Sequence, residues 1–276
     1  MPDIYQIDAF TNEPFKGNPA AVCILEKELD VSIYQKISAE MNLSETAFVY
    51  PLDSKKWSEA KRFSLRWFTP LTEVPLCGHA TLATAKVLFT EFQNQNPELE
   101  FETQSGILKA QKEKELILLD FPINEPKEID LKQDLSGIIG YNNLIRAMYN
   151  QKMRKLLLHI EDENVLKQLK PDFSKLMSQE FDMDTIGIIV TTESSEKYDF
   201  ISRFFAPWVG VSEDPVTGAA HTVLYPYWSK LLGKDKILAY QASERGGEVY
   251  LRSKSPDRVE LGGNSILVLK GKLEFK

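Results

Sequence analysis

The 276-residue sequence predicts an α+β fold made of two similar halves. Short apolar or alternating runs separated by tight turns are typical of strands, whereas two longer apolar runs have the length of buried helices. Each long run follows an aromatic strand that ends in proline and then a loop that leads to glycine. The second copy begins about half a chain length after the first, so a duplication is the interpretation that we favour.

Three landmarks support the repeat. The pentapeptide RWFTP that begins at Arg66 recurs as RFFAP at Arg203, and Gly78 before the first long helix matches Gly218 before the second. In a polar turn further downstream of each helix, Ser105 matches Ser243. Because the landmarks keep one order and one spacing, two similar halves are a better explanation than coincidence.

The elements of the first half can be assigned from turn residues and from apolar spacing. Asn42 suits the left-handed position that follows the end of a helix, and Pro70 stops a strand because proline cannot donate to the ladder. The expected elements are strands at 4–10 and 20–25, a helix at 32–41, strands at 47–50 and 63–68, a buried helix at about 79–92, and strands at 99–103, 107–111 and 116–121.

The second half begins after a charged, proline-containing connection at 125–134. We therefore expect an N-terminal half at 1–122 and a C-terminal half at 123–276, with the last strand able to cross back to the first half. The expected elements are a helix near 142–150, a strand at 155–160, a helix at 163–169, strands at 186–190 and 198–205, an apolar helix at 217–232, and strands at 237–241, 249–252, 258–261 and 265–269.

Composition excludes several classes of function. Lys and Arg number 33 against 40 Asp and Glu, a net charge of −7, and the basic residues are scattered, so we expect no nucleic-acid partner. Cys23 and Cys77 have no metal spacing and cannot form a disulfide framework, which fits a reducing cytoplasm. Neither a signal segment nor a membrane span is expected.

The starts of the two long helices are the candidate binding elements. Backbone N–H groups in the first turn of a helix have no intrahelical partner and favour negative charge, so Gly78 and Gly218 mark candidate anion-binding turns. If the two halves pack with these turns facing each other, one pocket is built from two helix dipoles. The sequence therefore predicts a small anionic ligand.

Four side chains near these turns are candidates for chemistry. Glu45 precedes an apolar strand, where partial burial favours proton transfer, although a solvated loop residue is the ordinary alternative. Asp214 precedes a proline and a helix, which suits either catalysis or capping. His79 and Cys77 lie at the first helix start, and each has a structural alternative as a buried residue.

Other polar residues have plainer interpretations. Arg66 and Arg203 precede aromatic pairs and are expected to pair with carboxylates near the core. His221 occupies a comparable place to His79 in the second copy, and His159 carries no motif. Nucleotide-binding and GxSxG fingerprints are absent, and the three His have no ligand spacing, so we predict no metal site.

Several motifs together resemble the PhzF family of phenazine-biosynthesis-like isomerases. The resemblance spans nearly the whole chain and closes with the glycine turn Gly262-Gly263-Asn264. The earlier motifs are Asp8-Ala9-Phe10 with Gly17-Asn18-Pro19-Ala20, Asn42-Leu43-Ser44-Glu45-Thr46, Phe68-Thr69-Pro70 with Glu73-Val74, Cys77-Gly78-His79-Ala80-Thr81 and Asp214-Pro215-Val216-Thr217-Gly218.

This resemblance implies a diaminopimelate-epimerase-like fold, in which each half is a curled mixed or antiparallel sheet around a long central helix and the site lies in the cleft between halves. It implies a homodimer and chemistry without a metal or organic cofactor. In the phenazine enzyme, a glutamate that matches Glu45 moves a proton, and residues that match His79 and Asp214 assist. Backbone N–H groups at positions that match Gly78 and Gly218 help to hold the substrate.

One departure concerns the residue after the second glycine. The phenazine enzyme and many relatives have Ser there, whereas this chain has Ala219, so a hydroxyl contact to substrate or to Asp214 is missing. The resemblance therefore predicts substrate binding near Ala219 without predicting the phenazine intermediate as substrate.

Three hypotheses follow from the sequence. The first is a cofactor-independent isomerase that uses Glu45 for general acid/base catalysis. The second is a thiol-dependent racemase or epimerase of the same fold that uses Cys77, and the third is a ligand-binding or interaction protein without turnover. Solvent deuterium exchange and its dependence on Glu45 and Cys77 distinguish them.

Overall fold

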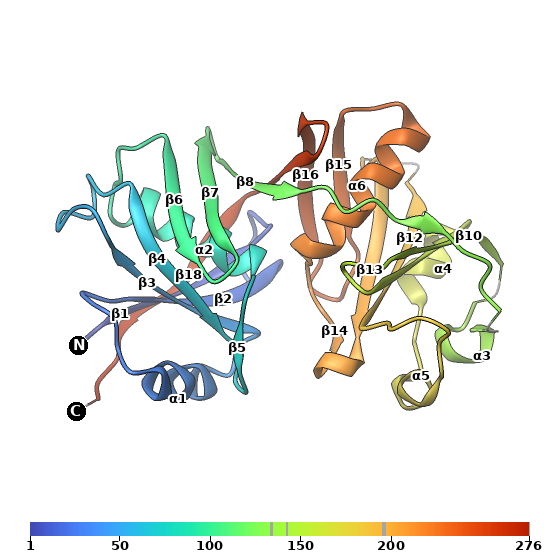
Figure 1. Cartoon of the computed structure of the whole chain (residues 1–276), viewed down its shortest axis with the longest axis horizontal. Helices are drawn as coiled ribbons and strands as arrows, with labels where there is room; N and C mark the ends of the chain where they lie inside the picture. Colours follow the sequence, from blue (N-terminus) through green and yellow to red (C-terminus); the bar gives the residue numbers. More distant parts are fainter. Residues whose placement is uncertain (133–134, 142, 195–196, 276) are drawn as a thin grey trace. The chain divides into compact units, whose positions relative to one another are not determined.

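The computed structural model describes residues 1–132, 135–141, 143–194 and 197–275 (Figure 1). The contacts within the chain define two compact units, Met1–Phe121 with Glu260–Lys276 as unit 1 and Pro122–Val259 as unit 2. No helix in the described ranges is long and apolar enough to cross a membrane.

Unit 1 is a mixed sheet with two helices. The sheet order is β18-β1-β2-β3-β4-β6-β7-β8, with the short β5 paired to β4. The elements are β1 (Asp3–Ala9), β2 (Asn18–Ile24), α1 (Val31–Met41), β3 (Glu45–Pro51), β4 (Arg62–Phe68), β5 (Glu73–Val74), α2 (Gly78–Thr90), β6 (Glu98–Thr103), β7 (Gly106–Glu113), β8 (Leu116–Pro122) and β18 (Ser265–Lys272).

Unit 2 has a sheet of order β9-β10-β11-β12-β13-β15-β16, with the short β14 paired to β13. Its elements are β9 (Lys127–Glu128), α3 (Ser136–Ile139), β10 (Leu144–Asn150), β11 (Lys155–Ile160), α4 (Glu163–Gln168), α5 (Phe173–Ser178), β12 (Gly187–Glu193), β13 (Phe200–Ala206), the 3-10 helix η1 (Pro207–Val209), β14 (Val211–Glu213), α6 (Gly218–Leu232), β15 (Lys236–Gln241), β16 (Gly247–Ser255) and the start of β17 (Arg258–Gly263).

The strand pairings of the two units follow one sequence. In unit 1, β1–β2 is antiparallel, β2–β3 parallel, β3–β4 and β4–β5 antiparallel, β4–β6 parallel and β6–β7 antiparallel. In unit 2, the same alternation joins β10–β11, β11–β12, β12–β13, β13–β14, β13–β15 and β15–β16. The helices α2 and α6 precede β6 and β15 in equivalent places.

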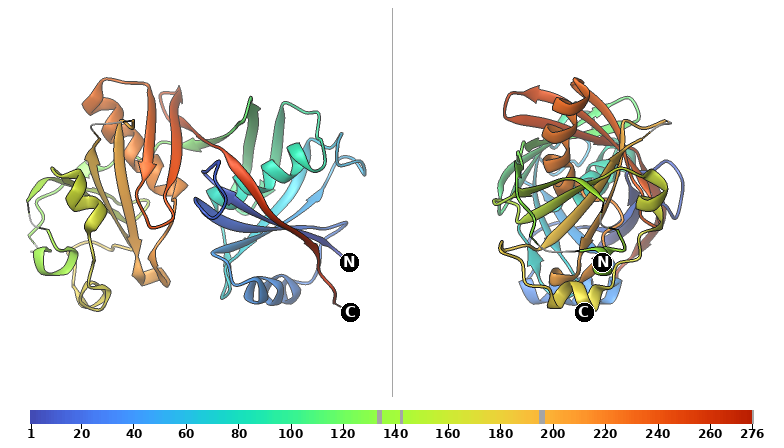
Figure 2. Two further views of the ribbon diagram at one scale, coloured as in Figure 1. Left: turned by 180° about the vertical axis from the view of Figure 1, so that it is seen from behind. Right: turned by 90° about the vertical axis from the view of Figure 1, so that its right-hand side faces the viewer.

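The C-terminal segment belongs to unit 1. After β17, the chain enters β18, which pairs with β1 in antiparallel register from Asp3 opposite Lys272 to Ala9 opposite Ser265. The view from behind in Figure 2 shows β18 beside β1, with both ends of the chain in the same unit. In unit 2 the corresponding edge, next to β10, is taken by β9.

Both long helices are buried because their residues leave almost no polar face. Ten residues of α2 are buried and it packs against β1, β2 and β3. α6 contains Pro226, which cannot donate the helical hydrogen bond to the carbonyl of Thr222. That carbonyl instead accepts from the backbone N–H of Asn124, and the Asn124 side chain donates to the Thr222 hydroxyl at 2.9 Å.

One predicted element is wrong. The sequence predicts a helix near 142–150, but residues 144–150 form β10, while Asn142 lies outside the described residues. Backbone pairing with β9 on one side and β11 on the other outweighs the local preference for a helix. The predicted connection at 125–134 contains β9, and its residues 133–134 lie outside the described ranges.

Candidate active site

Glu45 is the first residue of β3 and is held by rigid elements on both sides. Helix α1 is anchored by Tyr34, whose ring lies 4.5 Å from that of Phe48 between centroids. The helix ends at Asn42 in the predicted left-handed conformation, with φ 50° and ψ 36°, which turns the chain into β3. Glu45 then lies opposite Ala20 in the parallel ladder with β2, and its side chain is 19% exposed.

The structure brings Glu45, His79 and Cys77 together. His79 Nε2 lies 3.2 Å from Glu45 Oε2, although this contact is not aligned as a hydrogen bond. On the other side of the ring, His79 Nδ1 lies 3.5 Å from Cys77 Sγ. Cys77 is the N-cap of α2 and His79 is in its first turn, so the helix start positions both side chains beside the strand that carries Glu45.

The His79 ring is neutral at physiological pH. Burial lowers its pKa to about 3, because a buried imidazole loses the hydration that stabilises its charged form. A neutral imidazole has one N–H donor and one acceptor nitrogen. It can therefore present its N–H to the Glu45 carboxylate while accepting from the Cys77 thiol, or adopt the opposite tautomer.

The same three residues are the group of potential metal ligands within the described part of the chain. One ligand atom from each of Glu45, Cys77 and His79 can be chosen so that all lie within 4.8 Å of one another. Sulfur, imidazole nitrogen and carboxylate oxygen are all ligands that Zn²⁺ accepts. Sequence spacing could not show this group, because Glu45 comes from a strand far from the Cys77–His79 pair, and the expectation of no metal stays a prediction.

The starts of α2 and α6 differ from those of the other α-helices with assigned caps. Asp30, Asp162 and Asp172 each accept backbone N–H groups at the starts of α1, α4 and α5. By contrast, Cys77 and Thr217 make no side-chain capping hydrogen bond to α2 and α6. The N-cap side chains of the two buried helices thus do not occupy the first-turn N–H groups, as an anion-binding role requires, although in α6 the N–H of Ala220 donates to the carbonyl of Thr217.

Asp214 lies in the loop before α6, and two polar residues order that loop. Its Oδ2 accepts from the Thr217 hydroxyl at 2.5 Å, and its backbone N–H donates to the carbonyl of Phe204 at 3.1 Å. Gln241 donates to the Asp214 carbonyl and accepts from the Thr217 backbone N–H. The buried Gln241 amide therefore shapes the α6 turn that contains Gly218 and Ala219, a role that the sequence did not reveal.

Two charged pairs form equivalent parts of the framework. Arg66 binds Glu73 through Nε at 2.7 Å and Nη2 at 2.8 Å, and Arg203 binds Glu213 through the same atoms at the same distances. The prediction that each arginine pairs with a carboxylate is confirmed. Such bidentate pairs brace β4 against β5 and β13 against β14, which lead into the two helix starts.

The serines of the repeat are also equivalent in structure. Ser105 donates to the carbonyl of Pro75 at 2.7 Å, and Ser243 donates to the carbonyl of Pro215 at 2.8 Å. Each proline lies three residues before the first glycine of its buried helix. These bonds tie the turn after β6 to the loop before α2, and the turn after β15 to the loop before α6.

The other two histidines are structural. His221 Nδ1 lies 2.8 Å from the carbonyl of Thr217, and His159 Nδ1 lies 2.7 Å from the hydroxyl of Tyr227. Burial lowers the pKa of each to about 4. The position in unit 2 that matches His79 is Ala219, since both follow the first glycine of their helix, so His221 is not its counterpart.

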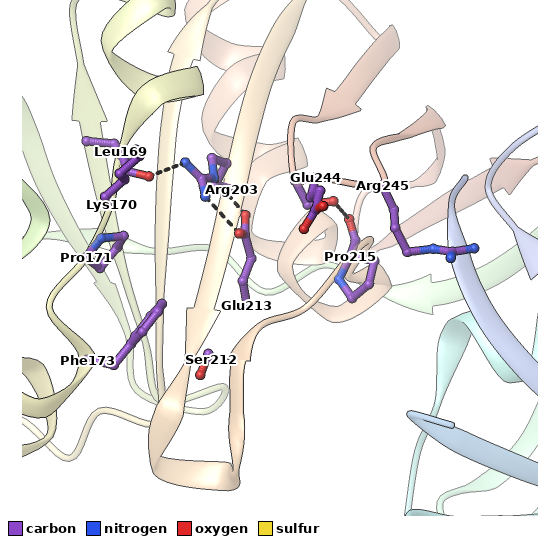
Figure 3. A pocket seen from close by; sticks show the side chains of 11 residues that line it. Leu169, Lys170, Pro171, Phe173, Arg203, Ser212, Glu213, Pro215, Glu244 and Arg245 are labelled. Atoms are coloured by element: carbon purple, nitrogen blue, oxygen red, sulfur yellow. Dashed lines mark hydrogen bonds and ion pairs between the residues drawn. The ribbon is translucent and has the colours of Figure 1, made fainter. Parts of the chain in front are cut away.

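A surface hollow of about 530 Å³ in unit 2 is a separate feature (Figure 3). Its walls include Arg203, Glu213, Pro215 and Arg245, and Figure 3 shows Arg203 paired with Glu213 at one side. The lining contains none of the predicted site residues. Because its central charges already serve the framework, this hollow does not define the candidate site.

The predicted site residues are divided between the two units. Unit 1 contains Glu45, His79 and Gly78, and unit 2 contains Asp214, Gly218 and Ala219. Sequence reasoning missed Lys155, which is 6% exposed on β11 and has Asp214 as its nearby charge. A lysine at the start of an apolar strand was the available signal.

Comparisons with known proteins agree on the family. A family model described as phenazine biosynthesis-like protein matches residues 7–271. An uncharacterized isomerase of Halalkalibacterium halodurans is 49% identical over 98% of this chain and 97% of its own. The crystal structure of a phenazine biosynthesis protein of the PhzF family from Enterococcus faecalis has a TM-score of 0.91 at 40% identity, covering 99% of both chains.

More distant likeness concerns the fold alone. A hydroxyproline epimerase from Agrobacterium vitis has a TM-score of 0.60 at 11% identity, covering 98% of this chain and 91% of its own. The mixed α+β fold is thus shared with an epimerase that is only 11% identical in sequence.

Proposed function

The chain belongs to the phenazine biosynthesis-like PhzF family, and from this premise we propose that it is a cofactor-independent isomerase that moves a proton on a small carboxylate-bearing substrate. The observation that carries the proposal is the Glu45 carboxyl at the start of β3, 3.2 Å from the buried, neutral His79. A positioned carboxylate of this kind is suited to general acid/base catalysis.

In the proposed reaction, Glu45 removes a proton from a carbon next to an electron-withdrawing group. The electron pair of the broken C–H bond is delocalised into that group, and the proton held by Glu45 is then delivered to a different carbon. No atom is gained or lost, and no oxidant is needed. His79 assists by facing its Nε2 toward the Glu45 carboxyl, where a neutral ring can accept or donate a hydrogen bond.

The substrate carboxylate is assigned to the helix starts. N–H groups at Gly78 in α2 and at Gly218 and Ala219 in α6 lie in first turns without side-chain caps. They would hold an anion and stabilise negative charge that develops beside the reacting carbon. The methyl side chain of Ala219 adds no hydrogen-bonding group, so substrate recognition depends on the surrounding backbone and on Asp214.

Joint action of the two units is part of the proposal. Equivalent strand pairings, Arg–Glu pairs and Ser–Pro bonds support an origin as two similar halves, and we propose that the helix starts of both halves serve one substrate. We further propose a cytoplasmic homodimer that binds neither nucleic acid nor membranes. Light scattering of the purified chain measures its oligomeric state.

Hydrogen exchange tests the catalytic proposal. Cyclic and amino carboxylic acids incubated with the protein in D₂O should include a compound that gains deuterium at carbon, as followed by NMR. Glu45→Gln should lower that rate by ~10²–10⁴-fold, because the amide cannot act as a base. Glu40→Gln, which changes an exposed carboxylate on α1, is the matched control and should exchange at the wild-type rate.

A second candidate is thiol-dependent racemisation, which is favoured by the Cys77 Sγ at 3.5 Å from His79 Nδ1. Thiol chemistry of this class normally uses two cysteines, and the equivalent helix start in unit 2 has Thr217 as its N-cap. We therefore expect Cys77→Ala to retain full exchange. Loss of exchange in that variant, with Glu45→Gln active, would reverse the assignment.

A third candidate, binding without turnover, predicts a different pattern. A carboxylic acid would raise the melting temperature by mass action, yet no compound would gain deuterium at carbon in the wild-type protein. Thermal shift followed by exchange on the same panel separates this case from catalysis.

A further inference from the structure

The first pairs of the two parallel ladders carry different charges. In unit 1, Ala20 on β2 lies opposite Glu45 on β3. In unit 2, the corresponding first pair is Lys155 on β11 opposite Gly187 on β12. Unit 2 thus has no carboxylate at the position of Glu45, and its charged side chain is on the neighbouring strand instead.

Gly187 leaves space for the Phe204 ring that contacts Lys155. A Cβ at Gly187 would lie 2.4 Å from Cζ of Phe204, which is closer than real atoms approach, so the ring occupies the space of the missing side chain. The Lys155 Nζ lies 4.8 Å from the centroid of the same Phe204 ring. This cation–π contact contributes part of what the buried ammonium loses on leaving water.

Asp214 is the charged group that acts on Lys155 within the described part of the chain. The flanking strand positions are Asn150 on β10 and Gly187 on β12, neither of which titrates. No hydrogen bond to the ammonium, and no ion pair within 4.0 Å of it, occurs among the described residues. Lys155 is therefore only 6% exposed, and its ammonium contacts the face of the Phe204 ring but no nearby anion.

Burial and the Asp214 charge shift the pKa of the Lys155 amine in opposite directions. Burial lowers the pKa of Lys155 to about 8, and the Asp214 charge keeps it from falling further. The side chain is still mostly protonated at neutral pH. A buried charge without a close partner costs folding free energy, and the fold has an uncharged alternative, because Ala20 fills the equivalent position in unit 1. Perturbed groups of this kind cluster at functional sites.

We propose that the Lys155 ammonium binds the carboxylate of the substrate beside Asp214. The inference rests on the proposed function, which requires an anionic substrate, and it adds a full positive charge to the partial charges of the helix starts. The substrate carboxylate would give the ammonium the charge-assisted hydrogen bond that the protein does not supply.

Binding of 2-aminobenzoate, measured by isothermal titration calorimetry at pH 6.5 and 9.5, tests the assignment. In the wild type, affinity should fall by ~10-fold or more at pH 9.5, because Lys155 loses its proton above about pH 8. Lys155→Met should bind ~10-fold or more weakly at pH 6.5 and lose the pH dependence. The three imidazoles have lowered pKa values and stay neutral over this range.

Matched variants make the result specific. Lys152→Met changes an exposed lysine of the same hairpin and should bind as the wild type does at both pH values. Lys155→Arg keeps its charge throughout and should bind equally at both. Aniline, which lacks the carboxylate, should show no difference between wild type and Lys155→Met.

The outcomes separate this proposal from the catalytic one. Glu45→Gln should still bind 2-aminobenzoate in a pH-dependent manner, whatever its exchange activity. Equal affinity of wild type and Lys155→Met overturns the role of Lys155, as does wild-type binding that is absent or independent of pH. Circular dichroism of Lys155→Met establishes that the variant is folded, which we expect because the replacement removes a buried charge.

Discussion

Units 1 and 2 use one framework to hold different chemistry. Glu45 at the start of β3 in unit 1 corresponds to Gly187 in unit 2, while Ala20 corresponds to Lys155. At the helix starts, unit 1 has Cys77 and His79 where unit 2 has Thr217 and Ala219. The framework keeps its backbone pairings, whereas the carboxylate, thiol and imidazole of unit 1 are replaced in unit 2 by a glycine, a hydroxyl and a methyl group.

The two Arg–Glu pairs also occupy equivalent positions in the two units but have different surroundings. Arg66 and Arg203 make the same two bonds to Glu73 and Glu213. Only Arg203 also donates to the carbonyl of Leu169, at 2.7 Å, which ties β13 to the segment after α4. Arg66 has an exposed third partner instead, the Glu28 carboxylate at 3.1 Å, so the equivalent residues share a core role and differ in the burial of their further contacts.

The largest expected effect distinguishes these two arginines. Arg203→Met should lower the free energy of unfolding by ~3–5 kcal/mol, because it leaves the partly buried Glu213 carboxylate unpaired and removes the hydrogen-bond donor of the Leu169 carbonyl. Arg66→Met should cost less, since the Arg66 side chain is 19% exposed against 11% for Arg203. Urea unfolding of both variants measures the difference, and equal losses would contradict the asymmetry.

A smaller effect of opposite sign is expected at Lys155. Its folded pKa of about 8 lies below the ordinary 10.5, so the unfolded chain binds a proton that the folded chain does not between these values. Stability should therefore rise with pH from about 8 to 10.5. Lys155→Met should raise the free energy of unfolding at pH 7 by ~3 kcal/mol and remove that rise.

The measurement for this prediction is thermal unfolding of wild type and Lys155→Met at pH 7 and pH 10. A variant that is less stable than the wild type at pH 7 would mean that the Phe204 and Asp214 contacts more than offset the burial of the amine. Ala20→Lys, the reverse change in unit 1, should destabilise because the residue is fully buried there.

The smallest expected difference is between the units themselves and amounts to the effect of one histidine ring. His79 in unit 1 and His159 and His221 in unit 2 all have pKa values lowered by burial, to about 3, 4 and 4. Below pH 6.5 the unfolded chain gains protons that these rings cannot take up, so stability falls by ~1.4 kcal/mol per pH unit for each ring.

Hydrogen exchange read by mass spectrometry at pH 7 and 5 locates this loss. Unit 2, with two buried imidazoles, should lose more protection than unit 1. A greater loss in unit 1 would place the acid-sensitive groups elsewhere.

Local patterns were sufficient to predict much of the fold. The two buried helices follow from apolar runs bounded by glycine, and the left-handed turn at Asn42 follows from its tolerance of that conformation. Residues 144–150 were misassigned because strand pairing is a long-range effect that a short apolar spacing cannot report. The short β5 and β14 escaped notice because two or three residues carry no periodicity.

The sequence predicted those residues of the candidate site that belong to a recognisable motif. It did not predict the contacts that depend on tertiary packing. Glu45 and His79 were named from sequence, but their 3.2 Å contact depends on the packing of β3 against the α2 start. Lys155 was missed because burial of a strand lysine arises from Gly187 and the Phe204 ring, which are distant in sequence. How the unit 1 and unit 2 residues act together stays a prediction.

The central claim is that a carboxylate at position 45 moves the proton, and chemical rescue tests it most directly. With a compound that exchanges in the wild type, Glu45→Ala should lose ~10²–10⁴-fold of the solvent deuterium exchange rate. Added formate should restore part of that rate in proportion to its concentration, because it supplies a carboxylate in the vacated space. Exchange at the wild-type rate in Glu45→Ala without formate would contradict the account.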